Sequence, residues 1–316
     1  MIVVCGEALV DLVPDDSSGA RYTAVPGGSP ANAAVALARL GIPTAMLVRL
    51  SGDAFGLRLR RHLSGNGIDL GLAVEAAEPS SLAIVELDEH AGASYRFDIS
   101  GTADWQWTDE ELPLDLPDAV RCLHAGSLAL TLPPGSDALE RFLYRVRPAH
   151  TVCIDPNVRP SVGGGPLLVD VDRWCTLADI VKASADDVAA LHPGEDPEVV
   201  ARRWQSFGPA VVIVTLGGDG VLAVTSDAAV RLPAPPTTVV DTVGAGDTFT
   251  AGLLASLHRA GALGGRLDHL GAAALTDALH YGMRAAASTC SRVGADPPYA
   301  EQLGAAHQEG PPGAHA

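Results

Sequence analysis

Basic and aromatic residues are scarce in this chain of 316 residues. It has 21 Lys and Arg residues, of which Lys182 is the one lysine. The chain has 38 Asp and Glu residues, so the formal net charge is −17. This balance argues against binding to nucleic acid or to an anionic membrane surface, because neutralising phosphates needs a basic face. A nucleotide substrate stays compatible, since one local pocket can be positive. Aromatic residues make up only 4%, so the core must be mostly Leu, Val and Ala.

Closely spaced cysteines and long apolar runs are also missing. The sequence has no Cys-x-x-Cys, and its five scattered cysteines predict buried thiols in a reducing compartment: Cys5, Cys122, Cys153, Cys175 and Cys290. The opening MIVVCGEALVDLVP has no basic segment of the signal-peptide kind, and no stretch reaches the length of a membrane span. We therefore expect a cytoplasmic protein without a membrane partner.

Strand-like and helix-like segments alternate along most of the chain, which is typical of a largely parallel sheet covered on both faces. Strands are expected over 1–10, 44–50, 122–125, 152–155, 180–183, 211–215 and 221–224. Helices are expected over 31–40, 53–66, 139–146, 188–191, 199–206, 245–259 and 270–290. The fold class predicted is α/β.

Two segments interrupt this alternation. Residues 12–25 contain a turn between two short strands, and residues 82–99 alternate as a β-hairpin does, with a turn near 90–92. Together they could form a small sheet apart from the core. We predict a core of 1–11, 27–81 and 101–305, a β lid of 12–26 and 82–100, and a disordered tail of 306–316.

The strongest chemical signal is the sequence DTVGAGDTF at 241–249. A strand-like stretch, 237–240, leads through glycines into a predicted helix, whose first N–H groups and dipole suit a phosphoryl group. Asp247 lies at this helix start and could take the proton of an attacking hydroxyl. A lone Gly-x-Gly-Asp would more often be an ordinary helix cap, but the full string is more specific.

The segment 241–247 resembles the C-terminal signature of the ribokinase-like (PfkB) carbohydrate kinase family. The family's other signature resembles GGSPANAAVALARLG at 27–41, and 155–159, 182–187 and 215–220 match in the same order. The resemblance extends from about residue 3 to 298. It implies a ribokinase-like three-layer α/β/α domain with a mostly parallel central sheet and a small β-sheet lid.

The resemblance also implies roles for the two signatures. Asp247 is the expected base, and the amides of Gly244, Ala245 and Gly246 are the expected anion hole. The expected sugar-binding residues are Asp11, Gly27, Gly28 and Asn32. For Asp11 the residues themselves agree, because a carboxylate at the end of a core strand is well placed to hold two hydroxyls. A turn residue at Asp11 and a helix cap at Asn32 are the alternatives.

The nucleotide and metal sites are implied in the same way. Candidate nucleotide contacts are Lys182, Ser184, Thr215, Gly217, Gly220, Gly246 and Cys290. Taken alone, the segment 215–220 reads as a hairpin turn. Ser184 and Asp187 stand where the family more often has Asn and Glu, and Asp187 keeps a carboxylate for Mg²⁺ through water. Asp241 lies where relatives bind a monovalent cation such as K⁺, although Pro298 replaces a hydroxyl ligand found in some of them.

The lid segment resembles that of fructokinases, and there Phe97 could cover the sugar and exclude water. Arg159 could contact the sugar or a phosphate, or form an ion pair. We expect ATP-dependent phosphorylation of fructose to fructose 6-phosphate. A kinase of 2-keto-3-deoxygluconate, with Arg96 or Arg159 at the carboxylate, of ribose or of a nucleoside is the alternative, and a non-catalytic sugar or nucleotide sensor is a second. A homodimer through the lid is also expected.

Overall fold

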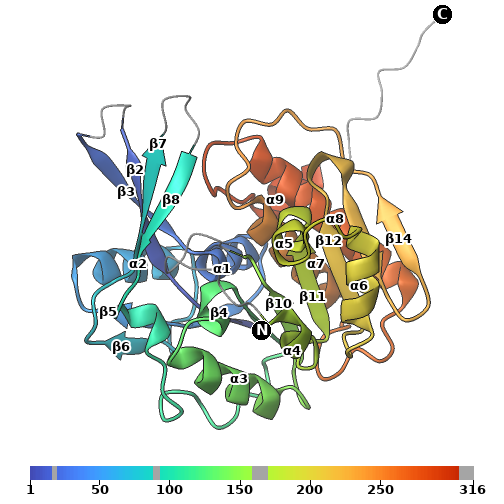
Figure 1. Cartoon of the computed structure of the whole chain (residues 1–316), viewed down its shortest axis with the longest axis horizontal. Coiled ribbons are helices and arrows are strands. Elements are labelled where there is room, and N and C mark those ends of the chain that lie inside the picture. Colours follow the sequence, from blue (N-terminus) through green and yellow to red (C-terminus); the bar gives the residue numbers. More distant parts are fainter. Residues whose placement is uncertain (16–19, 88–92, 159–169, 306–316) are drawn as a thin grey trace, which may run out of the picture.

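The central sheet has the strand order β14-β13-β12-β11-β10-β9-β1-β4. It is seen in a computed structural model that describes residues 1–15, 20–87, 93–158 and 170–305 (Figure 1). The strands are β1 (Ile2–Cys5), β4 (Thr44–Leu47), β9 (Cys122–Gly126), β10 (Thr151–Asp155), β11 (Ile180–Ser184), β12 (Val211–Thr215), β13 (Val221–Val224) and β14 (Ala229–Leu232). Pairing is parallel from β4 through β12, and antiparallel for β13 and β14. The predicted α/β class and mostly parallel sheet are confirmed.

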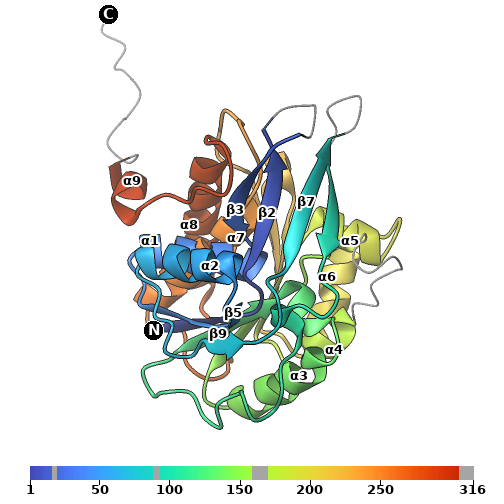
Figure 2. The same cartoon turned by 90° about the vertical axis from the view of Figure 1, so that its left-hand side faces the viewer.

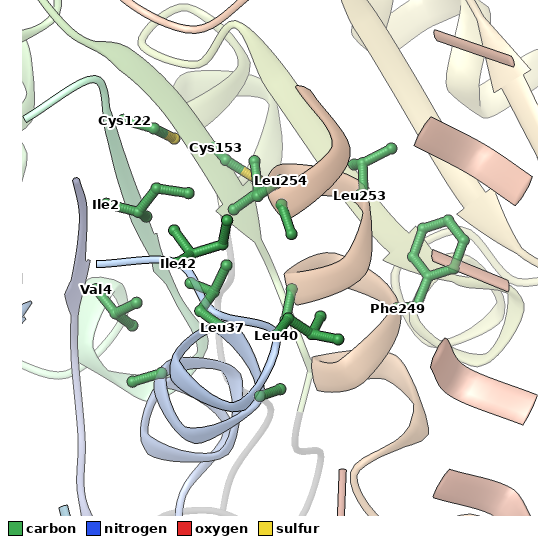
Figure 3. Packing of buried hydrophobic residues seen from close by; sticks show 14 of the residues in the cluster. Ile2, Val4, Leu37, Leu40, Ile42, Cys122, Cys153, Phe249, Leu253 and Leu254 are labelled. Atoms are coloured by element: carbon green, nitrogen blue, oxygen red, sulfur yellow. The ribbon is translucent and has the colours of Figure 1, made fainter. Parts of the chain in front are cut away.

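Helices cover one face of the sheet with a core rich in Leu and Ala. The helices on this face are α1 (Ser29–Arg39), α2 (Ala54–Gly65), α7 (Ala245–Arg259), α8 (Ala272–Cys290) and the short α9 (Ala300–Ala305). Figure 3 shows Leu37 of α1, Leu40 just after this helix and Leu254 of α7 in the cluster that packs against Ile2 and Cys153 of the sheet. Burying such side chains contributes roughly 1.5–3 kcal/mol each.

The opposite face carries all four tryptophans of the chain: Trp105, Trp107, Trp174 and Trp204. It is covered by η1 (Ala103–Trp105), η2 (Ser127–Leu130), α3 (Gly135–Val146), α4 (Val171–Cys175), α5 (Ala185–Leu191) and α6 (Pro197–Gln205). Each tryptophan is at most 3% exposed. The tryptophans are thus concentrated in one layer, and the predicted three-layer arrangement is confirmed.

A second sheet stands beyond the edge of the core (Figures 1 and 2). Its strands, in the order β3-β2-β7-β8, are β3 (Tyr22–Gly27), β2 (Leu9–Pro14), β7 (Leu82–Leu87) and β8 (Ala93–Asp98). The predicted hairpin over 82–99 is confirmed as the antiparallel pair β7–β8. The expected turn at 90–92 and the tail over 306–316 lie outside the described residues.

Two strand predictions were wrong because each merged strands of different sheets. The stretch 1–10 divides at Gly6, whose φ of +148° suits glycine, and β2 then belongs to the second sheet. The stretch 44–50 divides into β4 and β5 (Arg49–Ser51), which pairs with β6 (Val74–Ala76) in a separate ribbon. Both segments are buried on either side of the break, so apolar continuity could not reveal it.

Candidate active site

A cleft of about 920 Å³ lies between the second sheet and the carboxyl ends of the central strands. The ends of β10, β11 and β12 contribute Asp155, Ser184 and Thr215, and the second sheet contributes Asp11 and Phe97. The carboxyl edge is where open α/β sheets bind ligands. Of the predicted site residues, the cleft brings together Asp11, Gly28, Asn32, Phe97, Lys182, Ser184, Asp187, Thr215, Gly217, Gly244, Ala245, Gly246 and Asp247.

The carboxylate of Asp247, near the start of α7, is held by side chains from the start of α1. Asp247 occupies the third position of α7, and its Oδ1 accepts a hydrogen bond of 2.6 Å from the Ser29 hydroxyl. Its Oδ2 accepts one of 3.1 Å from the Asn32 side-chain amide. Ser29 and Asn32 are the first and fourth residues of α1, so the N-terminal ends of two helices meet at this carboxylate. Both oxygens are aimed by donors and stay half-buried in the cleft.

The glycine turn before α7 has the backbone shape that glycine permits. Gly244 is the N-cap residue at φ +74°, a left-handed conformation. The Ala245 N–H donates to the Thr242 carbonyl at 3.2 Å, whereas the N–H of Gly246, in the first turn of α7, has no carbonyl of the preceding helical turn to pair with. The expected strand over 237–240 is wrong: this part of the chain follows the proline-containing stretch 233–236 and forms no ladder.

Lys182 brings a buried positive charge to the first turn of α7. Its side chain is 4% exposed, and its ammonium donates to Asp155 Oδ2 at 2.8 Å. A Cβ on Gly246 would lie 2.9 Å from Lys182 Nζ, so the ammonium sits against the first turn of α7. Burial acts to lower the pKa of Lys182, but the carboxylates of Asp155, Asp187 and Asp247 outweigh it and hold the pKa above its usual value.

Asp155 is the carboxylate that balances Lys182. Burial raises its pKa to about 6 despite the neighbouring ammonium, with Asp187 and Asp247 adding to the rise. Its Oδ1 is buried and has no hydrogen-bond partner in the described part of the chain. An oxygen in this state can accept a proton or a cation.

Ser184 and Asp187 hold each other at the start of α5 in a capping box. Asp187 Oδ2 accepts hydrogen bonds from the Ser184 N–H at 2.7 Å and from its hydroxyl at 2.6 Å. Asp187 Oδ1 accepts from the Val158 N–H at 2.7 Å. The carboxylate is thus oriented by donors at the cleft, and Oδ1, which accepts a single hydrogen bond, keeps a lone pair for water or a ligand.

Asp11 reaches the cleft from the second sheet. It lies inside β2, so the expectation that it ends a core strand is wrong. A Cβ on Gly27 would lie 2.1 Å from Asp11 Oδ2, and one on Gly28, at φ +100°, would lie 2.9 Å from the Glu7 carbonyl. Because neither glycine has a Cβ, the Asp11 carboxylate can lie against Gly27 and the Glu7 carbonyl against Gly28.

Two aromatic rings of β8 share the face of Asp11. Strand register places Asp11 beside Ala83, and Ala83 opposite Phe97. The rings of Tyr95 and Phe97 stack at 6.3 Å between centroids, and both line the cleft. They form an apolar wall beside a carboxylate, which is a suitable surface for a sugar ring.

Gly27, Gly220, Cys290 and Asp241 do not line the cleft. Gly220 closes the β12–β13 turn at φ +97°, where a Cβ would lie 2.0 Å from the Leu232 carbonyl oxygen. The Cys290 carbonyl accepts the N–H groups of Val240 and Asp241. Asp241 accepts from the Val243 and Gly294 N–H groups at 3.0 and 2.8 Å, which joins the loop before α7 to the one after α8. Arg159 lies outside the described residues.

Several cleft residues were missed as site candidates. Ser29 and Asp155 lie within the matched segments 27–41 and 155–159, so position in the signatures could have found them. Glu7, Leu9 and Ser127 also line the cleft. Glu7 and Ser127 come after the apolar strands β1 and β9, and Leu9 is the first residue of β2. Nothing in the local sequence distinguishes them from packing residues.

An oriented carboxylate, the N-terminal end of a helix and a buried ammonium lie beside a sheet with a polar and aromatic face. These are the features of a phosphoryl-transfer enzyme. The sequence profile of the pfkB family carbohydrate kinases matches residues 1–302. The chain belongs to this family and is a sugar kinase. The predicted family and enzyme class are thereby confirmed.

Curated relatives support this assignment. A fructokinase of Rhizobium leguminosarum bv. trifolii is 37% identical over 81% of this chain and 79% of its own length. A fructokinase of Klebsiella pneumoniae is 35% identical over 96% and 97%. An aminoimidazole riboside kinase of Salmonella typhimurium is 33% identical over 81% of each chain.

Solved structures show the same fold. A structure of aminoimidazole riboside kinase from Salmonella enterica, with aminoimidazole riboside and an ATP analogue, is 30% identical and has a TM-score of 0.81. The aligned region covers 96% of this chain and 98% of the Salmonella enterica chain. A fructokinase double mutant from Vibrio cholerae, with fructose, ADP and potassium ion, is 28% identical with a TM-score of 0.81, covering 96% and 97%. Among the described residues, no helix of this chain has the length and apolarity that crossing a membrane requires.

Proposed function

We propose that this sugar kinase transfers the γ-phosphoryl group of MgATP to the primary hydroxyl of fructose, giving fructose 6-phosphate. The observation that carries the proposal is the carboxylate of Asp247, held by Ser29 and Asn32 in the cleft that Asp11 and Phe97 also line. The fructokinases among the relatives favour fructose as the sugar.

In this mechanism Asp247 accepts the proton of the sugar hydroxyl as its oxygen attacks the γ-phosphorus in line. The new O–P bond forms while the bond to the β-phosphate oxygen breaks, and ADP leaves with that electron pair. The amides of Gly244 and Gly246 would face the phosphoryl oxygens. The Ala245 N–H, which donates to Thr242, has a smaller part in this anion hole than we expected.

Lys182 is proposed to hold the transferring phosphoryl group. Its ammonium lies against the positive, N-terminal end of α7 and donates to the Asp155 carboxylate. Two positive features repel each other unless an anion lies between them. A phosphoryl group in this position would satisfy both.

The described residues fit a magnesium site of the kind completed by substrate phosphates. No cluster of three ligating side chains occurs among them, and Mg²⁺ in kinases uses one or two carboxylates together with phosphates and waters. Asp155, through its unpartnered Oδ1, and Asp187, through water, would hold the ion. Bound there, Mg²⁺ neutralises phosphate charge. A K⁺ ion near Asp241 would act by rigidifying the loop before α7.

On the nucleotide side, Ser184, Thr215 and Gly217 are proposed to contact ATP, since they line the cleft at the ends of β11 and β12. Gly220 supports this site only by shaping the turn. Cys290 supports it through the backbone bonds that its carbonyl accepts.

The lining of the cleft favours a neutral sugar over a keto acid. Lys182 is the one basic side chain among the described lining residues, and it is engaged by Asp155. Arg96 pairs with Glu86 at 3.3 Å and is 65% exposed, so it is occupied outside the cleft. A riboside is the second candidate, because relatives include aminoimidazole riboside kinases.

The lid is proposed to move as a unit, consisting of 12–26 and 82–100, and to pair with a second copy. Val13, Val25 and Tyr95 are each about 40% exposed on its cleft face, and its outer strands β3 and β8 have open edges among the described residues. A monomeric mass in solution scattering would remove the dimer. All five cysteines are free, which supports a cytoplasmic enzyme.

The test measures ADP release from MgATP across fructose, ribose, 2-keto-3-deoxygluconate and nucleosides, for the wild type and Asp247→Asn. Fructose-dependent turnover should fall by about a hundredfold or more in the variant, the range for losing a general base. Asp137→Asn is the matched control, because Asp137 holds the same third position in α3 but is exposed outside the cleft. Turnover with another sugar only would correct the substrate, and sugar binding without any turnover would favour the sensor.

A further inference from the structure

Segments that join the core to the lid meet at one buried carboxylate, Asp104 of η1. Its Oδ1 accepts the N–H of Ala8 at 3.0 Å, and its Oδ2 accepts the hydroxyl of Ser81 at 2.5 Å. Ala8 immediately precedes β2, and Ser81 immediately precedes β7. One side chain of the core therefore holds the beginnings of the two central strands of the lid.

A third segment reaches the same point. Thr102, which follows β8, has its hydroxyl 2.6 Å from that of Ser81. The Ser81 carbonyl also accepts the N–H of Val10 at 3.1 Å, so β2 and β7 are tied to each other where they leave the core. The residues where the chain enters and leaves the hairpin β7–β8 are thus joined in one hydrogen-bond network.

The network is closed to solvent and stays outside the cleft. Asp104, Ser81 and Thr102 are at most 4% exposed, and none of them lines the cleft. Arg49 of β5 holds η1 in place by donating to the Ala103 carbonyl at 2.8 Å, and it forms an ion pair with Glu111 at 3.1 Å. Burial raises the pKa of Asp104 to about 6, against hydrogen bonds from Ser81 and Ala8, so the position keeps a carboxyl that is costly to ionise.

The residues beside these anchor points face the substrate. Glu7 and Leu9 flank Ala8 and line the cleft, and Asp11 lies two residues further along β2. Phe97 lies on β8, which pairs with β7. A shift at Ala8 or Ser81 would move these side chains relative to Asp247, which belongs to the core.

We propose that Asp104 is a positioning residue that fixes the base of the lid, and thereby sets the sugar-facing side chains of the lid at their working distance from Asp247. This inference rests on the proposed function in that the sugar lies between the lid and Asp247. Asp104 acts through Ala8 and Ser81 and touches no substrate itself.

The first test compares Asp104→Ala with Asp104→Asn in steady-state kinetics, with the sugar that the wild type accepts. Alanine leaves the buried Ala8 N–H and Ser81 hydroxyl without an acceptor, and the KM for sugar should rise about tenfold or more, while the KM for ATP stays within about twofold. Asparagine keeps one acceptor oxygen and should restore most of the sugar affinity.

Asp179→Asn is the matched control. Asp179 is equally buried, its pKa is also raised to about 6 by burial, and it accepts the Val152 N–H at 2.8 Å, but it lies outside the cleft and the lid. This variant should lower stability without raising the KM for sugar. If Asp104→Ala raises the two KM values together, or no more than Asp179→Asn does, Asp104 is merely structural and the inference is overturned.

Amide hydrogen exchange of the protein without substrate gives an answer that does not depend on turnover. Exchange over 8–12 and 82–87 should quicken by about tenfold in Asp104→Ala and stay unchanged in Asp179→Asn. Unchanged exchange in Asp104→Ala overturns the inference even if fructose is phosphorylated. If the wild type accepts no sugar, the proposed function fails, and the exchange rates still decide the role of Asp104 as anchor of the lid.

Discussion

Lys182 is the only lysine of the chain, and its ammonium is almost completely withdrawn from water. Burying an ammonium costs several kcal/mol unless partners compensate for its lost hydration. Asp155 provides one partner at 2.8 Å, and Asp187 and Asp247 add to the negative field. A charge kept in the cleft at such a cost is expected to serve the ligand that binds there.

A single lysine allows a direct test by NMR. Protein labelled with ¹³C at the ε-carbon of lysine should give one side-chain signal, and Lys182→Met, which should lack it, serves as the control. Because the phosphoryl group is proposed to lie between Lys182 and the first turn of α7, a non-hydrolysable ATP analogue should shift this signal. Fructose alone should shift it much less. A signal that stays in place at saturating analogue would refute the phosphate contact.

The turn between β12 and β13 shows how one short element serves two purposes. Gly217 lines the cleft at φ +57° and has open space where a Cβ would be. Gly220, three residues later, packs against the Leu232 carbonyl oxygen and faces away from the cleft. The cleft side and the sheet side of the turn can therefore be separated by mutation.

Alanine at these two glycines should give different results. Gly220→Ala combines a left-handed backbone with a collision and should lower the free energy of unfolding by about 2–4 kcal/mol. Gly217→Ala should lower it by only about 1 kcal/mol while raising the KM for ATP. Chemical denaturation and steady-state kinetics measure the two effects. Equal stability losses would show that Gly220 does not have the structural role assigned to it.

The sequence was sufficient to predict most elements, but not which of them meet. Periodicity and glycine signals located α7 and the strands that end at the cleft, because these features are local. The change of sheet between β1 and β2 escaped prediction, since the start of each strand is apolar and only residues 6–8 separate them, with the positive φ of Gly6 at the break. The bond from Ser29 to Asp247 joins positions 218 residues apart, and no local pattern encodes such a contact.

At the scale of the whole molecule, three separate buried carboxyl groups have raised pKa values. Burial raises the pKa of Asp104, Asp155 and Asp179 to about 6 in each case. A folded pKa above the unfolded value means that the folded state binds the proton more tightly. The associated stability is fully present below about pH 4 and is lost as the pH rises through about 6.

Asp179→Asn isolates one of these groups. Buried His124, whose pKa falls to about 4 mainly because of burial, acts in the opposite direction, so the difference between wild type and variant is the useful quantity. Relative to the variant, the wild type should be more stable at about pH 4.5 than at about pH 7, by on the order of 1–3 kcal/mol. Denaturant unfolding at several pH values measures this difference. A difference that is constant, or that grows with pH, would contradict the raised pKa.

Asp109→Asn provides a control of opposite sign. The hydrogen bond from exposed Arg141 holds the pKa of Asp109 below its usual value. Its contribution to stability is present above the unfolded pKa and is lost as the pH falls. Relative to this variant, the wild type should therefore lose stability on acidification.

The strand order also has a consequence for synthesis of the chain. β1 lies between β4 and β9, so the first strand is enclosed only after residue 126 has been made. All four lid strands lie before residue 99, whereas Asp247 and its helix come nearly 150 residues later. At a translation rate of about 5–20 residues per second, the four lid strands emerge roughly 7–30 s before Asp247, the proposed base. During that interval the nascent chain has exposed apolar lid strands and no finished cleft, and this is when a chaperone would be most useful to it.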